Sequence, residues 1–121
     1  MHNPGFLKLV DDAKTRVKQI DIEGYKKMLA ARAPHVLVDT REESEWANGH
    51  VAGAVHLSKG IIEREVETAF PDKATTLVLY CGGGFRSALV ADNLQRMGYT
   101  GAISLDGGWR ALKDSDLPME K

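Results

Sequence analysis

Short apolar runs alternate with amphipathic segments along most of the chain. Apolar runs typical of buried strands occupy residues 36–38, 77–80 and 102–105, with shorter strand-like pieces at 19–21 and 53–57. Apolar residues at helical spacing predict helices over 25–32, 42–47, 61–70, 87–97 and 109–113. Because strand and helix alternate, we expect an α/β fold, with a mostly parallel sheet and helices on both of its faces.

The N-terminal segment carries a helical pattern of its own. Asn3 and Pro4 are typical of a helix start, where a capping side chain precedes a proline in the first turn. The apolar residues that follow recur at helical spacing, at Phe6, Val10, Ala13 and Val17. We therefore expect an amphipathic helix that packs on the rest of the protein and does not bind a membrane.

Side chains that can bind or react with a ligand follow two of the predicted strands. Asp39 and Arg41 come directly after the run at 36–38, and Cys81 comes directly after the run at 77–80. In open parallel sheets, ligands bind beyond the carboxyl ends of the strands. The strand order along the chain thus predicts that these three residues lie on one rim of the sheet.

Cys81 is the only cysteine, and it heads a glycine-rich loop between a strand and a helix. The residues that follow it are Gly82, Gly83, Gly84, Phe85, Arg86 and Ser87. Glycines allow the backbone to turn its N–H groups toward one point, and the helix N-terminus and Arg86 add positive charge there. These influences favour the thiolate over the thiol, so we interpret Cys81 as a nucleophile in an anion-binding loop. The loop lacks the Lys-Ser/Thr ending of a nucleotide-binding P-loop.

Composition limits the classes of function. The chain has 121 residues, 43% of them hydrophobic and 27% charged, with a net charge of -1. This composition is typical of one globular domain and gives no reason to expect nucleic acid or a membrane as a partner. One cysteine cannot form an internal disulfide, and the N-terminus lacks a signal pattern, so we expect a cytoplasmic protein. The scattered histidines and single cysteine show no metal-ligand spacing, and we expect no metal or cofactor.

Four segments in order carry a resemblance to a known family. The segments are residues 38–41, 45–54, 81–87 and 105–109. Together they resemble the rhodanese domain over residues 20–118. The resemblance implies an α/β domain with a central five-stranded sheet, and it leaves residues 1–19 as a helical extension packed on that domain.

The resemblance also implies roles for particular residues. Cys81 matches the cysteine that carries a persulfide, and the loop that binds substrate around it matches Gly82, Gly83, Gly84, Phe85, Arg86 and Ser87. Asp39 matches a residue whose role is to support the structure of the site. Arg41 either meets the substrate anion or pairs with a carboxylate, for which the candidates are Glu42, Glu45 and Asp39.

The implied reaction is transfer of a sulfane sulfur. The Cys81 thiolate would take sulfur from thiosulfate or a persulfide donor and pass it to a thiophilic acceptor, which is cyanide in assays and a thiol or protein in the cell. An ionised thiol needs no general base, and sulfite leaves without a proton.

Two alternatives stand beside this interpretation. A cysteine-dependent phosphatase or arsenate reductase also holds a thiolate among amides with an arginine, but such loops place five residues between cysteine and arginine, whereas four lie between Cys81 and Arg86. Tyr80 also stands where that motif has histidine. The second alternative is a non-catalytic sulfur carrier or interaction module, which the intact Cys81 and Arg86 disfavour.

Overall fold

A five-stranded parallel sheet forms the centre of the protein. The computed structural model describes residues 2–121. The strands, in spatial order, are β1 (Lys18–Ile20), β6 (Ala102–Leu105), β5 (Leu77–Tyr80), β2 (Val36–Asp39) and β4 (Val55–His56). All four neighbouring pairs are parallel. The α/β class and the five-stranded sheet predicted from the sequence are confirmed.

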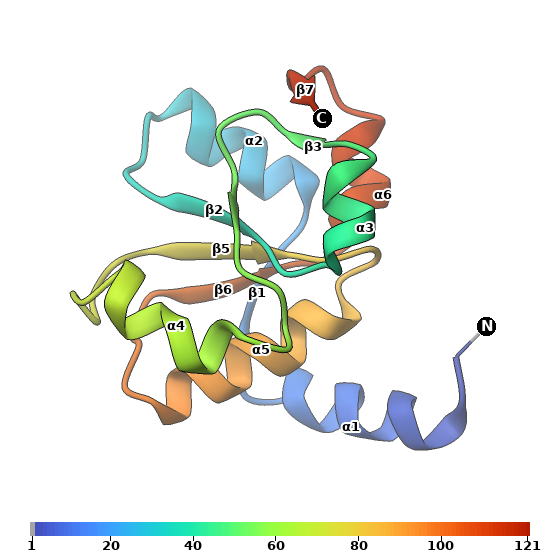
Figure 1. Ribbon diagram of the computed structural model, residues 1–121, viewed down its shortest axis with the longest axis vertical. Helices are drawn as coiled ribbons and strands as arrows, with labels where there is room; N and C mark the ends of the chain where they lie inside the picture. The colour runs from blue at the N-terminus through green and yellow to red at the C-terminus, as the bar shows by residue number, and fades with distance from the viewer. Residues whose placement is uncertain (1) are drawn as a thin grey trace.

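Helices cover both faces of this sheet (Figure 1). One face carries α1 (Pro4–Lys14), α4 (Ile62–Ala69) and α5 (Phe85–Arg96), and the other carries α2 (Ile22–Ala30), α3 (Glu43–Ala47) and α6 (Gly108–Lys113). The central strand β5 is buried on both sides, because alternate residues point to opposite faces. Leu77 and Leu79 join the core under α4 and α5, whereas Val78 and Tyr80 join the core under α2 and α6. This explains why its sequence is a continuous apolar run.

A small second sheet has no counterpart in the sequence prediction. Strand β3 (His50–Val51) pairs antiparallel with β7 (Met119–Glu120) near the C-terminus. Two-residue strands show no hydrophobic period, so the pattern could not indicate them. Helix α5 also begins two residues earlier than expected, at Phe85, because Gly84 caps it with a φ of 97°.

The predicted N-terminal helix is present as α1 and packs on α5. Val10 and Ala13 are each 1% exposed in this interface. Beyond the helix end, Arg16 donates to both carboxylate oxygens of Asp92 on α5, at 3.1 and 2.7 Å. Apolar burial and this ion pair therefore hold α1 on the domain. Within residues 2–121, no helix combines the length and apolar character needed to cross a bilayer.

Candidate active site

The carboxyl end of β5 delivers Cys81 into a tight loop, which we call the cysteine loop (residues 81–87). The sulfur receives backbone hydrogen bonds from the N–H of Gly84 at 3.2 Å and the N–H of Ser87 at 3.4 Å. Gly84 can aim its N–H at the sulfur because its φ of 97° is open to glycine but strained for other residues. Cys81 is 1% exposed, so a substrate reaches its sulfur only through the adjoining pocket.

Two buried hydroxyl groups support the sulfur from the side of the sheet. Ser87 Oγ lies 3.6 Å from the Cys81 sulfur and 2.9 Å from Ser104 Oγ. Both serines are 0% exposed. Ser104 was not among the predicted site residues, and its signal in the sequence is a hydroxyl within the apolar run at 102–105. A hydroxyl can both accept and donate, so Ser87, backed by Ser104, can hydrogen-bond the Cys81 sulfur from this side.

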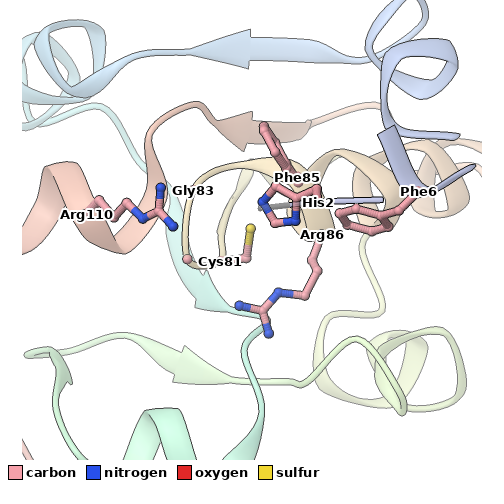
Figure 2. A pocket seen from close by; sticks show the side chains of 8 residues that line it. His2, Phe6, Cys81, Gly83, Phe85, Arg86 and Arg110 are labelled. Atoms are coloured by element: carbon pink, nitrogen blue, oxygen red, sulfur yellow. The ribbon is translucent and has the colours of Figure 1, made fainter. Parts of the chain in front are cut away.

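Helix α6 is joined to the cysteine loop by backbone hydrogen bonds. The N–H of Trp109 donates to the Cys81 carbonyl at 2.7 Å, and the N–H of Arg110 donates to the Gly82 carbonyl at 3.1 Å. The approach requires glycine at position 108, because a Cβ there would overlap the Cys81 carbonyl. The contact places the Arg110 side chain beside the loop, where Figure 2 shows its guanidinium near Gly83. Sequence reasoning missed Arg110.

A pocket of about 360 Å³ opens at the cysteine. Five of the predicted site residues line it, namely Cys81, Gly82, Gly83, Phe85 and Arg86. Three residues that the sequence did not indicate complete the lining, namely His2, Phe6 and Arg110. The remaining loop residues, Gly84 and Ser87, are buried and support the sulfur through their N–H groups. The cysteine loop is therefore one site, but its wall includes elements distant in sequence.

The two arginines of the pocket differ in their charge balance. Arg86 donates two hydrogen bonds to the Glu45 carboxylate of α3, at 2.8 and 3.1 Å. The bonds to Glu45 raise the pKa of Arg86, and the bonds from Arg86 lower the pKa of Glu45. Arg110, in contrast, forms no ion pair with any carboxylate of residues 2–121. The charge of Arg86 is thus largely offset, while that of Arg110 is available to an anion.

Arg41 and Asp39 form a buried ion pair away from the pocket lining. Asp39 is 0% exposed and Arg41 3%. Asp39 accepts hydrogen bonds from the Arg41 backbone N–H at 2.9 Å and from Nη2 at 2.8 Å, and the same Nη2 donates to the Gly49 carbonyl at 2.7 Å. The guanidinium also lies 4.4 Å from the Trp109 ring centre. Burial acts to lower the pKa of Arg41, but the bonds and charge of Asp39 outweigh it and raise that pKa. Of the roles open to Arg41, this geometry favours pairing with Asp39 over contact with substrate.

The arrangement defines a class of domain: a parallel α/β sheet that presents one cysteine, within an amide-lined loop, at its carboxyl edge. The rhodanese-like domain family model matches residues 21–115. The chain therefore belongs to the rhodanese-like domain family.

Similar proteins and solved structures agree with this assignment. Thiosulfate sulfurtransferase PspE of Escherichia coli is 32% identical over 84 residues, which cover 69% of this chain and 77% of PspE. Putative sulfurtransferase YtwF of Bacillus subtilis is 31% identical over 102 residues, covering 84% of this chain and 96% of YtwF. A solved structure from Rhodopseudomonas palustris, described as of unknown function and "Possible Tyrosine Phosphatase", matches with a TM-score of 0.86 and 25% identity, covering 99% of this chain and 97% of that one. Similarity to the named sulfurtransferases supports rhodanese-type sulfur transfer in general.

Proposed function

We propose that the protein is a sulfurtransferase that moves a sulfane sulfur from thiosulfate or a persulfide donor to a thiophilic acceptor through a persulfide on Cys81. The observation that carries this proposal is the pair of backbone N–H groups, from Gly84 and Ser87, that donate to the Cys81 sulfur at the base of a pocket. Donors aimed at the sulfur stabilise it as an anion, both as thiolate and as persulfide.

The first half of the reaction fits the pocket. The Cys81 thiolate attacks the outer sulfur of thiosulfate, a Cys–S bond forms, and the S–S bond of the donor breaks. Its electron pair leaves with sulfite, while the transferred sulfur keeps its negative charge at the end of the Cys81 persulfide. Because Cys81 itself is nearly buried, the outer sulfur projects into the pocket, where Arg86 and Arg110 meet the anionic donor and product.

The second half returns the enzyme to its starting state. An acceptor attacks the outer sulfur of the persulfide, and the electron pair of the broken S–S bond returns to Cys81 as thiolate. Cyanide would leave as thiocyanate in an assay, and a thiol or a protein cysteine would leave as a persulfide in the cell. A reducing cytoplasm, in which the single thiol stays free, suits this cycle.

Mass spectrometry after thiosulfate treatment tests the proposal. We expect the protein to gain the mass of one sulfur atom, to lose it on addition of cyanide, and to yield thiocyanate. Cys81→Ser should show neither gain nor turnover. An unchanged mass in the wild-type protein would contradict the proposal and favour a non-catalytic interaction module.

A phosphatase is the alternative that one relative's description raises. The same preparation should be assayed with p-nitrophenyl phosphate. Phosphate release that depends on Cys81, without sulfur uptake, would favour a phosphatase. We expect sulfur uptake without phosphate release, because the loop has only four residues between Cys81 and Arg86 to surround a tetrahedral anion.

A further inference from the structure

One side of the active-site pocket is built by aromatic side chains, two of which come from outside the family-matched residues. Phe6 lies on α1 and His2 just before it, whereas the family model begins at residue 21. Both line the pocket together with Phe85, the first residue of α5. We call these three residues the aromatic wall.

The three rings form one contiguous cluster. The ring centres of His2 and Phe85 are 4.7 Å apart, those of His2 and Phe6 are 5.3 Å apart, and those of Phe6 and Phe85 are 6.3 Å apart. All three pairs are tilted, which is a favourable arrangement for aromatic rings. Lys14, the last residue of α1, also places its ammonium 4.9 Å from the Phe85 ring centre and 3.7 Å from Asp106. These contacts help to hold α1 against Phe85 of the cysteine loop.

The opposite side of the pocket is cationic. Figure 2 shows the guanidinium of Arg110 on one side of Cys81, with the rings of His2 and Phe6 on the other. Thiosulfate is a small inorganic dianion and has no apolar part that such rings could contact. The pocket volume of about 360 Å³ falls in the range of roughly 300–1,000 Å³ that is usual for sites of organic ligands. The wall and the volume therefore exceed what thiosulfate requires.

We propose that the aromatic wall selects an organic sulfur donor, one whose sulfane sulfur belongs to an anionic head that carries an apolar group. In such a donor the anionic head faces Arg110 and the loop amides, and the apolar group packs against Phe6, His2 and Phe85. A thiosulfonate, R–SO2–S⁻, has this chemistry. The Cys81 thiolate takes its terminal sulfur, a Cys–S bond forms, the S–S bond breaks, and the electron pair leaves with the sulfinate R–SO2⁻. This inference rests on the sulfur transfer proposed above and names the substrate class of that site.

The test compares two thiosulfonates that differ only in the apolar group. Donor kcat/KM is measured for benzenethiosulfonate and methanethiosulfonate with cyanide as acceptor, in the wild-type protein and in variants. The two donors differ in intrinsic reactivity. This difference cancels when the kcat/KM for benzenethiosulfonate is divided by that for methanethiosulfonate, and this ratio in a variant is divided by the same ratio in the wild type. We expect that quotient to fall roughly tenfold in Phe6→Ala, because a phenyl group loses an aromatic contact that a methyl group never makes.

Two further variants keep the result interpretable. His2→Ala removes an exposed ring with no part in the core, so it should lower the quotient several-fold without affecting folding. Leu9→Ala is the matched control, since Leu9 lies on the same helix but is 61% exposed and does not line the pocket, and its quotient should stay at one. Equal losses for both donors in Phe6→Ala, together with an unchanged quotient in His2→Ala, would overturn the proposal and leave the wall as packing only. Failure of the wild-type protein to take sulfur from thiosulfate or either thiosulfonate would instead contradict the sulfur-transfer function itself.

Discussion

Replacing Glu45 by glutamine tests whether the carboxylate beside Arg86 weakens the binding of an anionic donor. Its oxygens lie 2.8 and 3.1 Å from the two terminal nitrogens of Arg86. Glutamine keeps an oxygen that can accept from Arg86, and from the Glu42 N–H that Glu45 caps at 3.0 Å. Glu45→Gln therefore removes the charge and keeps the two bonds that Oε1 accepts, while the second bond from Arg86, to Oε2, is lost because an amide NH2 cannot accept it.

The size of the effect follows from distance and charge. A donor on the far side of the Arg86 guanidinium lies about 7 Å from the Glu45 carboxylate, since two hydrogen-bond lengths and the width of the guanidinium separate them. At that distance the repulsion is about 0.6 kcal/mol per unit of donor charge at the dielectric constant of water. For divalent thiosulfate, after screening by salt, this amounts to about 1 kcal/mol, or roughly a fivefold change in binding.

The assay is the initial rate of thiocyanate formation, with thiosulfate varied at saturating cyanide and at low and high ionic strength. We expect the KM for thiosulfate to fall about fivefold in Glu45→Gln at low salt, and the gain to shrink at high salt. Glu43→Gln is the matched control, because Glu43 is an exposed carboxylate on the same helix and forms no ion pair with Arg86.

Acid pH provides a second check on the same reasoning. The hydrogen bond from Arg86 holds the pKa of Glu45 below its usual range, so the wild-type carboxyl stays charged until the pH falls below that range. As the pH falls through this lowered pKa, Glu45 is neutralised and the wild-type KM should approach that of Glu45→Gln. An unchanged or raised KM in Glu45→Gln would refute the charge argument and mean that the carboxylate serves to position Arg86.

Three further substitutions have defined outcomes. Arg110→Ala should raise the KM for thiosulfate about fivefold, because the pocket loses a cation that has no carboxylate partner among residues 2–121. Lys113→Ala, on the same helix, should leave this KM unchanged. A KM in Arg110→Ala equal to that of the wild type would show that Arg110 does not bind thiosulfate. Asp39→Asn should lower the free energy of unfolding in urea by about 3 kcal/mol, since it leaves the Arg41 guanidinium buried without its carboxylate, and a loss under about 1 kcal/mol would contradict this. Asp92→Asn should lower the free energy of unfolding by about 1–2 kcal/mol at neutral pH. The hydrogen bond from Arg16 lowers the pKa of Asp92 in the folded state, so its stabilisation is present above the unfolded pKa of about 4 and is lost as the pH falls through the lowered value. A difference between Asp92→Asn and the wild type that persists to low pH would be inconsistent with this linkage.

The rim of the sheet could be predicted because it follows from local pattern and one topological rule. The apolar runs at 36–38 and 77–80 predict buried strands of one parallel sheet, whose carboxyl ends place Asp39 and Cys81 on the same edge. The structure adds that these two strands are direct neighbours. In the structure Asp39 pairs with Tyr80 in the register of β2 and β5, one residue before the cysteine. The partner of Arg41 stayed open in the sequence, since the spacing of charges alone does not separate Asp39 from Glu42 or Glu45.

The walls of the pocket could not be predicted, because they depend on contacts between distant elements. Arg110 reaches the site only because the start of α6 is hydrogen-bonded to the carbonyls of Cys81 and Gly82. The glycine at 108 is a local sign of this approach, but it does not show that the side chain two residues later faces the cysteine. Glu45 reaches Arg86 across the gap between α3 and α5, which no spacing in the sequence encodes.

The apolar face of α1 shows why a packing pattern can conceal a binding surface. Phe6, Val10 and Ala13 recur at one helical spacing, and the pattern assigns them all to packing. Val10 and Ala13 are buried, as expected, but Phe6 is only half-buried and lines the pocket with Phe85. Because α5 begins inside the cysteine loop, α1, which packs over the first turn of α5, extends its apolar face to the pocket at the Cys81 sulfur. The same hydrophobic contact that stabilises the extension therefore also shapes the active site, and a substitution at Phe6 is expected to alter donor preference as well as packing.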